Sequence, residues 1–404
     1  MRVRLARVEC ARGISMLNVT KLLCDVEQPM DALRYGQGAG APRSARDRKP
    51  VVVWNVSRTC NLRCEHCYSD SRADRYAGEL THEQGRALLD DLAAFRVPAV
   101  LLSGGEPLAR ADTLELAAYA RSLGLKLTLS TNGTLIDERR AARIREIGFA
   151  YVGISIDGIG ETNDRFRGVS GAFDRAMRGI RNCKAVGQKV GLRLTLTPWT
   201  VRDLDAIFDL IEAEDIERAC FYHLVPTGRG RVATSLSAAE TRRAVDTIFR
   251  RTRQFWRDGR PREILTVDNH ADAAYLYLSL LREDSARATR ALEALLWNGG
   301  GANSSGIGIA DVDTQGNVHP DQFLQSVTLG NVKERRFSAI WTDESNATLA
   351  ALRDRKGRLH GRCSVCTFLP ICGGNFRARA FNLHGDLWAS DPGCYLSDAE
   401  IGIA

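Results

Sequence analysis

From residue 50 onward, short apolar segments alternate regularly with longer amphipathic ones. Six segments rich in β-branched residues have the length and apolarity of buried strands, at residues 51–57, 99–105, 126–132, 151–157, 189–197 and 218–226. Six further stretches have the apolar periodicity of helices that bury one face, at residues 81–95, 113–123, 137–147, 171–186, 201–214 and 238–255. Strands that alternate with helices predict βαβ units and a parallel sheet. With six units rather than eight, the sequence predicts an α/β fold built as an open, partial (β/α)6 barrel.

Length and charge restrict the classes of protein to which this chain can belong. The 404 residues are enough for two or three domains. No apolar run reaches the roughly 18 residues of a membrane helix, and the arginine-rich start lacks the apolar core of a secretory signal. The net charge of +7 is spread along the chain, without a basic stripe interleaved with aromatic residues. We therefore expect an anionic substrate, and neither nucleic acid nor membrane as a partner.

The 11 cysteines do not form an evident disulfide framework, because seven of them fall into two compact groups. Cys10, Cys24, Cys183 and Cys220 are scattered along the chain. Isolated thiols of this kind are typical of a reducing compartment, so we expect a cytoplasmic protein.

The first group, Cys60, Cys64 and Cys67 in the run CNLRCEHCY, directly follows the first predicted strand. Three thiolates at this spacing can hold three irons of a cubane cluster and leave the fourth iron without a protein ligand. A small molecule could bind at that open iron. A zinc knuckle, or three unrelated buried thiols, are the alternatives.

Polar residues follow the ends of the later strands, where ligands bind in sheets of this kind. Gly104, Gly105 and Glu106 end the second strand; glycines let the backbone approach a ligand, and a carboxylate can bind an ammonium group. Helix capping and surface solvation are the alternative roles for the residues at the other strand ends. These further candidates are Thr131, Asn132, Ser155, Asp157, Arg165 and Arg167.

The second group, Cys363, Cys366, Cys372 and Cys394, lies at the other end of the chain with the spacing C-x2-C-x5-C-x21-C. Four thiolates could hold a structural zinc ion or an iron–sulfur cluster, and the spacing alone does not decide between them.

The cysteine loop and the GGE element at the end of the next strand together resemble the radical S-adenosylmethionine (SAM) enzymes. This resemblance implies a [4Fe-4S] cluster on Cys60, Cys64 and Cys67 whose open iron binds SAM. It also implies that Gly104, Gly105 and Glu106 bind the methionine amino group of SAM, a role that the family gives to this element. The ribose and carboxylate of SAM would then contact Ser155, Thr131 and Asn132, with Asp157 and Arg165 as further cofactor-binding candidates.

In this context the cysteine-rich tail resembles the SPASM/twitch extension, which holds auxiliary [4Fe-4S] clusters. The full pattern has a further cysteine four positions after the third, where this chain has Phe376, so we expect one fully ligated auxiliary cluster. The predicted division is an N-terminal segment at 1–49, the barrel at 50–260, a helical and loop connector at 261–310, and the auxiliary cluster domain at 311–404.

Segments such as ILTVDNHADAAYLYL and GNVHPDQF are similar to one branch of the radical SAM enzymes, which modifies tetrapyrrole side chains. The resemblance implies removal of two acetates from 12,18-didecarboxysiroheme to give iron-coproporphyrin III, in siroheme-dependent heme synthesis. Propionate removal in heme d1 synthesis, or peptide maturation by an enzyme with the same cysteine groups, are the alternatives. Residues 1–15 have no recognisable counterpart, which makes Met16 a candidate for the functional start.

An anionic iron tetrapyrrole would need cationic partners, proton donors and an electron source. Paired arginines can grip its carboxylates, although solvated loop arginines are the alternative. Histidines could donate protons or bind the substrate iron, or serve only the structure. A flavodoxin or ferredoxin-like protein would supply electrons. The candidates for these roles are Arg229, Arg231, Arg377 and Arg379 among the arginines and His223, His270 and His319 among the histidines.

Overall fold

The computed structural model describes residues 16–27, 31, 49–297, 305–355 and 357–403. The expectation for residues 1–15, like most of the predicted segment 1–49, lies outside these residues. Cys10 lies outside them as well. Within them, no helix is long and apolar enough to cross a lipid bilayer.

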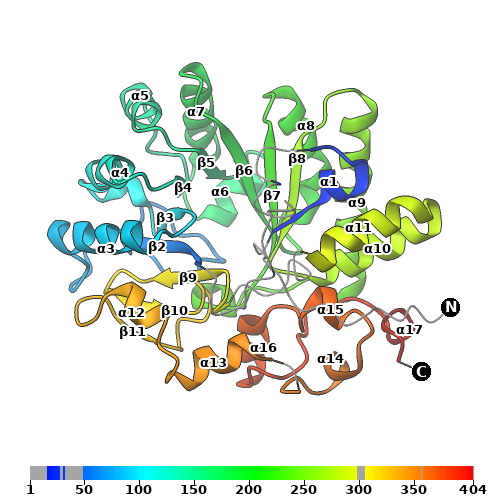
Figure 1. Cartoon of the computed structure of the whole chain (residues 1–404). Coiled ribbons are helices and arrows are strands. Elements are labelled where there is room, and N and C mark those ends of the chain that lie inside the picture. Colours follow the sequence, from blue (N-terminus) through cyan, green and yellow to red (C-terminus); the bar gives the residue numbers. More distant parts are fainter. Residues whose placement is uncertain (1–15, 28–30, 32–48, 298–304, 356, 404) are drawn as a thin grey trace.

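A curved sheet forms the centre of the molecule, and its strands from β2 to β8 lie side by side in sequence order (Figure 1). Six of them pair in parallel at the places the sequence predicts, which confirms the fold class. They are β2 (Val51–Ser57), β3 (Val100–Gly104), β4 (Leu127–Thr131), β5 (Tyr151–Ser155), β6 (Val190–Leu196) and β7 (Arg218–His223).

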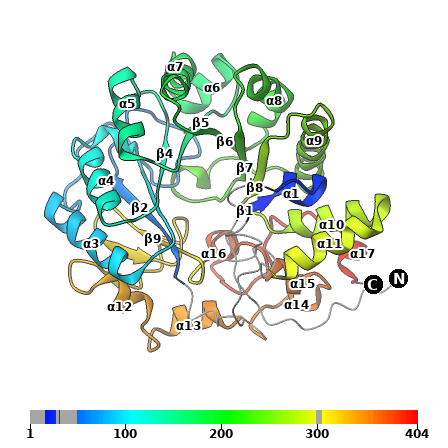
Figure 2. The same cartoon turned by 45° about the horizontal axis from the view of Figure 1, so that its top comes forward.

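The predicted helices form a layer around the outside of this sheet (Figure 2). Capping boxes begin two of them, with Thr81 and Gln84 at the first and Ser237 and Glu240 at the last. The predicted helix 201–214 starts instead with a 3-10 turn, η3 (Thr200–Asp203). The outer helices are α3 (His82–Phe95), α4 (Thr113–Ser122), α5 (Glu138–Ile147), α7 (Ala172–Ala185), α8 (Leu204–Ala213) and α9 (Ala238–Arg257).

The sheet extends beyond the six predicted strands at both edges, to 11 strands in all. Residues 263–267, which the sequence placed in a connector, form β8 (Glu263–Val267), parallel to β7. β1 (Met16–Asn18) pairs antiparallel with β8. At the opposite edge β9 (Ile309–Val312) runs parallel to β2, and the short strands β10 (Asn317–His319) and β11 (Gly330–Asn331) follow antiparallel. The sheet therefore crosses the positions 260 and 310, and the domain limits there stay predictions.

The remaining helices are short, apart from α10 and α11, and α12 to α17 lie together along one side of the molecule (Figure 1). They are α1 (Val19–Cys24), α6 (Glu161–Arg167), α10 (Ala271–Glu283), α11 (Ser285–Trp297), α12 (Phe337–Trp341), α13 (Ala347–Arg353), α14 (Arg362–Val365), α15 (Leu369–Cys372), α16 (Arg377–His384) and α17 (Asp398–Ile401), with the 3-10 turns η2 (Pro107–Ala109) and η4 (Gly228–Arg231).

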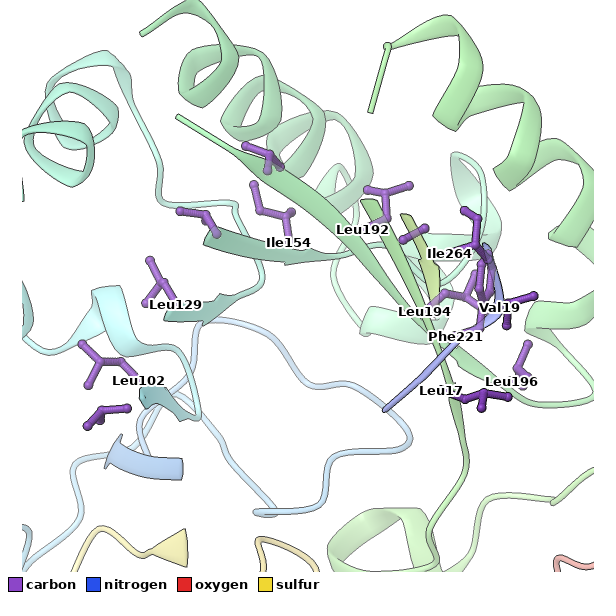
Figure 3. Packing of buried hydrophobic residues seen from close by; sticks show 14 of the residues in the cluster. Leu17, Val19, Leu102, Leu129, Ile154, Leu192, Leu194, Leu196, Phe221 and Ile264 are labelled. Atoms are coloured by element: carbon purple, nitrogen blue, oxygen red, sulfur yellow. The ribbon is translucent and has the colours of Figure 1, made fainter. Parts of the chain in front are cut away.

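The two faces of the sheet differ because side chains alternate along each strand. On the outer face, leucines and isoleucines such as Leu102, Leu129 and Ile154 are fully buried against the helices (Figure 3). Burial of each such side chain contributes about 1.5–3 kcal/mol. The inner face instead carries Ser103 and Ser155 among other polar residues, and they line a cavity at the carboxyl ends of the strands. The alternation of side chains along the strands thus places polar side chains inside the barrel.

Candidate functional site

A cavity of about 150 Å³ opens inside the barrel, at the end where the parallel strands finish. The predicted residues that line it are Cys60, Cys64, Cys67, Gly104, Gly105, Thr131, Asn132 and Ser155, together with Arg167, His223 and Arg229. Residues from four strand ends and the cysteine loop, far apart in the sequence, therefore meet in one place.

The cysteine loop is held by hydrogen bonds that also reach the sulfur atoms. The backbone N–H of Arg63 donates to the carbonyl of Arg167 at 3.0 Å, which fixes the loop against α6. The Cys60 Sγ accepts from the backbone N–H of Leu62 at 3.4 Å, and the Cys64 Sγ accepts from Nη1 of Arg167 at 3.6 Å. Donors aimed at sulfur stabilise the thiolate form that binds metals.

The donor set at this loop fits an iron–sulfur cluster. Burial raises the pKa of Cys60 to about 12 and also raises that of Cys64, so these thiols lose their protons only where a cationic group offsets the cost. In the described part of the chain, no three His, Cys, Asp or Glu side chains are arranged to hold a metal ion. Three thiols around a shared cavity suit a cluster that spreads its charge over several irons.

Gly104 and Gly105 are required by the close approach of β3 to the cysteine loop. Gly104 has a φ of +124°, and a Cβ there would lie 2.4 Å from the carbonyl oxygen of Ser57. A Cβ on Gly105 would lie 2.4 Å from the carbonyl oxygen of Thr59 and 2.6 Å from that of Arg58. The backbone N–H of Gly105 donates to Ser57 at 2.7 Å, which joins the two segments directly.

We therefore expect Gly105→Ala to displace the cysteine loop and to lower the iron content. It should also lower the free energy of unfolding by about 1–3 kcal/mol, which is the usual cost of overpacking. Iron analysis and thermal unfolding under anaerobic conditions measure the two effects. Gly124→Ala serves as the control, since a Cβ there meets nothing within 4 Å. The φ of +83° strains an alanine at this position without any clash. Equal iron content in the two variants would contradict the prediction.

The side chain of Glu106 lies behind the residues that line this cavity, and its predicted contact with SAM stays a prediction. The carboxylate is fully buried and accepts from the Thr131 hydroxyl at 2.7 Å and from the backbone N–H of Asn132 at 2.8 Å. Burial raises its pKa. Glu106 thus joins the end of β3 to the end of β4 and orients Asn132, whose side-chain amide donates to Asn61 at 2.8 Å.

Asp157 also acts from behind the cavity wall. It forms an ion pair with Arg167 and accepts from the backbone N–H of Thr195 at 2.7 Å. Arg167 in turn reaches the Cys64 sulfur and lines the cavity. The fully buried carboxylate therefore holds the guanidinium beside the cysteine loop.

Of the two arginines in this segment, Arg165 is the one that the structure does not bring to the site. It is exposed, and its guanidinium stacks on the ring of Trp199 at 4.5 Å. The helical turn of α6 points residues two apart in different directions, which the sequence motif alone could not distinguish. His66, in the aromatic position of the cysteine loop, stacks on Phe166 at 4.7 Å, and burial lowers its pKa to about 4.

Among the candidate catalytic residues, His223 lines the cavity and is hydrogen-bonded to Asp272, whose Oδ2 lies 2.9 Å from Nε2. The other oxygen of Asp272 accepts from the hydroxyl of Tyr395 at 2.8 Å. His319 lies elsewhere: it is buried in β10, with Nδ1 at 2.9 Å from the carbonyl oxygen of Val327. His270 likewise lines neither this cavity nor the larger one described below.

Arg229 bridges the cavity and the cysteine loop. Its Nε donates to the carbonyl of Cys64 at 3.0 Å, and its Nη1 donates to Asp70 at 2.8 Å. By contrast, Arg377 is buried in the C-terminal part and donates to its backbone, to the carbonyl groups of Leu387 and Ala389. Arg379 is also buried, and it joins the tail to the barrel by donating to Asp391 and to the carbonyl of Asp268. Neither arginine lines the two cavities of the barrel.

A second, larger cavity of about 760 Å³ adjoins the first and shares Tyr68, Arg229 and Phe323 with it. Arg58, Arg72 and Arg231 also line it. The sequence analysis missed Arg58 and Arg72, although both flank the cysteine loop in the chain. Their position beside that loop was the available signal, but only the fold shows that the loop turns them toward a common space.

The second cysteine group also converges. Cys363, Cys366, Cys372 and Cys394 line one small cavity between α14, α15 and the segment before α17. Burial raises the pKa of Cys394 to about 11 and raises that of Cys372, so here too a cationic group is needed to hold the thiolates. Four thiols around an apolar pocket fit a fully ligated cluster. The scattered cysteines among the described residues, Cys24, Cys183 and Cys220, are buried and unpaired.

Comparison with known proteins agrees with this arrangement. The model of the radical SAM superfamily matches residues 54–211, and that of an iron–sulfur cluster-binding domain of the SPASM type matches residues 306–367. Fe-coproporphyrin III synthase of Methanosarcina barkeri is 51% identical, over 96% of this chain and 99% of that protein. Pre-heme d1 synthase of Dinoroseobacter shibae is 47% identical, over 90% of each. A solved structure, native anSMEcpe with bound AdoMet, superposes with a TM-score of 0.68 at 20% identity, covering 88% of this chain and 97% of that one.

The chain therefore belongs to the radical SAM superfamily, in the family that includes Fe-coproporphyrin III synthase and pre-heme d1 synthase. It is a radical SAM enzyme that uses a [4Fe-4S] cluster with SAM, and its C-terminal part contains an iron–sulfur cluster-binding domain. The predicted fold, enzyme class and cofactors are confirmed.

Proposed function

We propose that this enzyme removes the two acetate side chains of 12,18-didecarboxysiroheme and releases iron-coproporphyrin III. The similarity to Fe-coproporphyrin III synthase over nearly the full length of both chains carries this proposal. Pre-heme d1 synthase is the second candidate, because its identity is only slightly lower. The maturases are more distant: mycofactocin maturase MftC of Mycobacterium tuberculosis is 28% identical over 89% of this chain, and the solved SuiB complex with its precursor peptide shares the fold at 20% identity.

The residue roles that we propose follow the two cavities. Cys60, Cys64 and Cys67 would hold the SAM-binding cluster, and the four cysteines of the tail would hold one auxiliary cluster. Gly104, Gly105, Thr131, Asn132 and Ser155 would contact SAM, with Glu106 and Asp157 positioning that wall from behind.

The larger cavity has the size and charge for a polycarboxylate ring. Ligand cavities of about 300–1,000 Å³ are usual for small molecules, and 760 Å³ is within that range. Asp70 is shared by three arginines, with distances of 3.6 Å to Arg58, 3.8 Å to Arg72 and 2.8 Å to Arg229. One carboxylate cannot neutralise three guanidinium groups, so anionic side chains of a ligand would be attracted to this wall.

The cluster and SAM, when bound, supply a radical that takes a hydrogen atom from carbon. We expect that hydrogen to come from the saturated ring carbon next to the carbon that bears the acetate. Homolytic cleavage of the bond to the acetate group would then form a ring double bond, and the extended conjugation favours this step. The side chain would leave as a carboxymethyl radical, and one electron from the protein electron donor together with one proton would convert it to acetate. Each acetate requires one such event, so two SAM molecules are consumed per ring.

Anaerobic incubation of the enzyme with SAM, a reductant and didecarboxysiroheme tests the proposal, with the product identified by mass. We expect loss of both acetates. Loss of propionates would favour the activity of pre-heme d1 synthase instead, and an unchanged ring would refute both. In a second arm, deuterium at the saturated ring carbons should appear in 5′-deoxyadenosine, whereas label from the acetate methylene would refute the cleavage scheme.

The electron source and the location are also part of the proposal. A flavodoxin or ferredoxin-like protein would deliver single electrons, and the net charge of +7 favours an acidic partner of this kind. The buried, unpaired cysteines suit a reducing cytoplasm.

A further inference from the structure

One wall of the inner cavity carries polar groups that the cluster and SAM sites do not use. Arg193 lies in the middle of β6, between Leu192 and Leu194, which face the outer helices. Its side chain therefore points into the barrel, where it lines the cavity. Gly153 on the neighbouring strand makes room for it, since a Cβ there would lie 2.7 Å from Cδ of Arg193. Glycine at position 153 thus accommodates the side chain of Arg193.

The guanidinium of Arg193 has no carboxylate or hydrogen-bond partner among the residues that the structure describes. Its guanidinium carbon lies 4.7 Å from the centre of the Tyr222 ring, and its charge also acts on the carboxyl group of Asp268. A charged group that is partly withdrawn from water needs a counter-charge, and leaving it without one costs free energy. An anionic group of a ligand would supply that charge.

Asp268 faces the same cavity from the end of β8. Its side chain is buried, and its Oδ2 has no hydrogen-bond partner. Its backbone has a φ of +65°, a left-handed conformation that aspartate tolerates, and its carbonyl accepts from Arg379 at 2.6 Å. A buried polar atom without a partner at the wall of a cavity calls for an explanation, and contact with a ligand supplies one.

Burial raises the pKa of Asp268 to about 7, although the nearby charges of Arg379 and Arg193 act in the opposite direction. Near neutral pH a large share of this carboxyl group is therefore protonated and can donate a hydrogen bond to an anion. Gln322 lines the same wall, and its Oε1 also lacks a partner. Because an amide can turn either end toward a ligand, it can donate as well.

We propose that Arg193 and Asp268, with Gln322 beside them, form an inner subsite that binds the carboxylate of the acetate side chain to be removed. This inference rests on the proposed function and names the contact that selects the reacting edge of the ring. The guanidinium forks onto the carboxylate, and the protonated Asp268 donates to it. In this arrangement the arginines that line the larger cavity bind the propionates, which stay on the ring. The subsite adjoins the cysteine loop, where the hydrogen atom is removed.

Binding of two iron tetrapyrroles to the anaerobic, cluster-loaded enzyme tests the subsite. The first probe is didecarboxysiroheme, and the second is iron-coproporphyrin III, which lacks the acetates. We expect Arg193→Gln to weaken the first about tenfold or more in an absorbance titration and to change the second less than about threefold. Iron content and SAM binding should match the wild type. Arg193→Lys, which keeps the charge without the fork, should fall between.

Arg202→Gln is the matched control, since Arg202 also stacks on an aromatic ring, at 4.9 Å from Trp199, but is exposed and outside the cavity. Asp268→Asn keeps a donor and tolerates the left-handed backbone, so it should bind didecarboxysiroheme within about threefold of the wild type. A loss as large as that of Arg193→Gln would overturn the donor role of Asp268.

The outcomes separate the two proposals. If the wild type binds both rings and Arg193→Gln weakens neither, the subsite is wrong while the proposed function stands. Equal weakening of both rings would assign Arg193 to a propionate and would overturn the acetate assignment. If the wild type binds neither ring, the proposed substrate class fails, and the subsite fails with it.

Discussion

Replacing Cys64 by alanine is expected to abolish reductive cleavage of SAM and to lower the iron content from about eight to about four per chain. Cys64 is a buried thiol of the first group, and Nη1 of Arg167 donates to its sulfur at 3.6 Å. Two thiols cannot hold the cubane in place of three, and the guanidinium of Arg167 would keep only its ion pair with Asp157. The tail cluster is separate from this loop and should remain.

Quantification of 5′-deoxyadenosine and of iron and sulfide in the anaerobically reconstituted protein measures both effects. Cys183→Ala is the control: Cys183 is fully buried in α7, contacts neither cavity, and should leave iron content and SAM cleavage unchanged. SAM cleavage that survives in the Cys64 variant, or an iron content that does not fall, would rule out the proposed ligand set.

The local pattern of the chain predicted the barrel because each of its strands is a self-contained apolar segment followed by a helix. The edges of the sheet were not predictable in this way. β9 is only four residues long, and β8, although as long as β3, follows the last of the six regular pairs of strand and helix. Both become strands because β7 and β2 offer unpaired edges, which is a tertiary effect.

The residues of the site were likewise only partly predictable from the sequence. The cysteines and the two glycines stand in short motifs, so their convergence followed from the order of the strands. Arg193 and Asp268 belong to no motif, and only the pairing of the sheet shows that their side chains face the cavity. Conversely, Arg377 looked like a ligand for anions but is fully buried and donates to the carbonyl groups of Leu387 and Ala389.

Hydrogen bonds join the C-terminal tail to the wall of the barrel cavity. Damage to the tail can therefore change the cavity as well. The backbone N–H of His270 donates to the side chain of Asn375 at 2.6 Å, and Arg379 donates to the carbonyl of Asp268 at 2.6 Å. Both contacts hold the segment after β8 that carries the proposed subsite. A tail that merely loosens should therefore weaken tetrapyrrole binding, whereas a tail that only lacks its cluster should not.

The double substitution Cys363→Ala and Cys366→Ala is accordingly expected to abolish tetrapyrrole turnover while SAM cleavage without the tetrapyrrole continues. Iron should fall from about eight to about four per chain. The reason is that the auxiliary cluster would supply electron transfer that removal of the side chain requires and that SAM cleavage does not. Product mass, 5′-deoxyadenosine and the Kd of didecarboxysiroheme are measured on the same preparation.

Ser364→Ala provides the control for this pair, because Ser364 lies between the two cysteines in α14, is exposed, and donates only to the carbonyl of Gly361 at 2.8 Å. The Kd decides the interpretation. Turnover lost with an unchanged Kd would assign an electron-transfer role to the tail cluster. Turnover lost together with a weakened Kd would instead make the cluster a structural element that holds Asn375 and Arg379 against the segment after β8. Unchanged turnover would dismiss both roles.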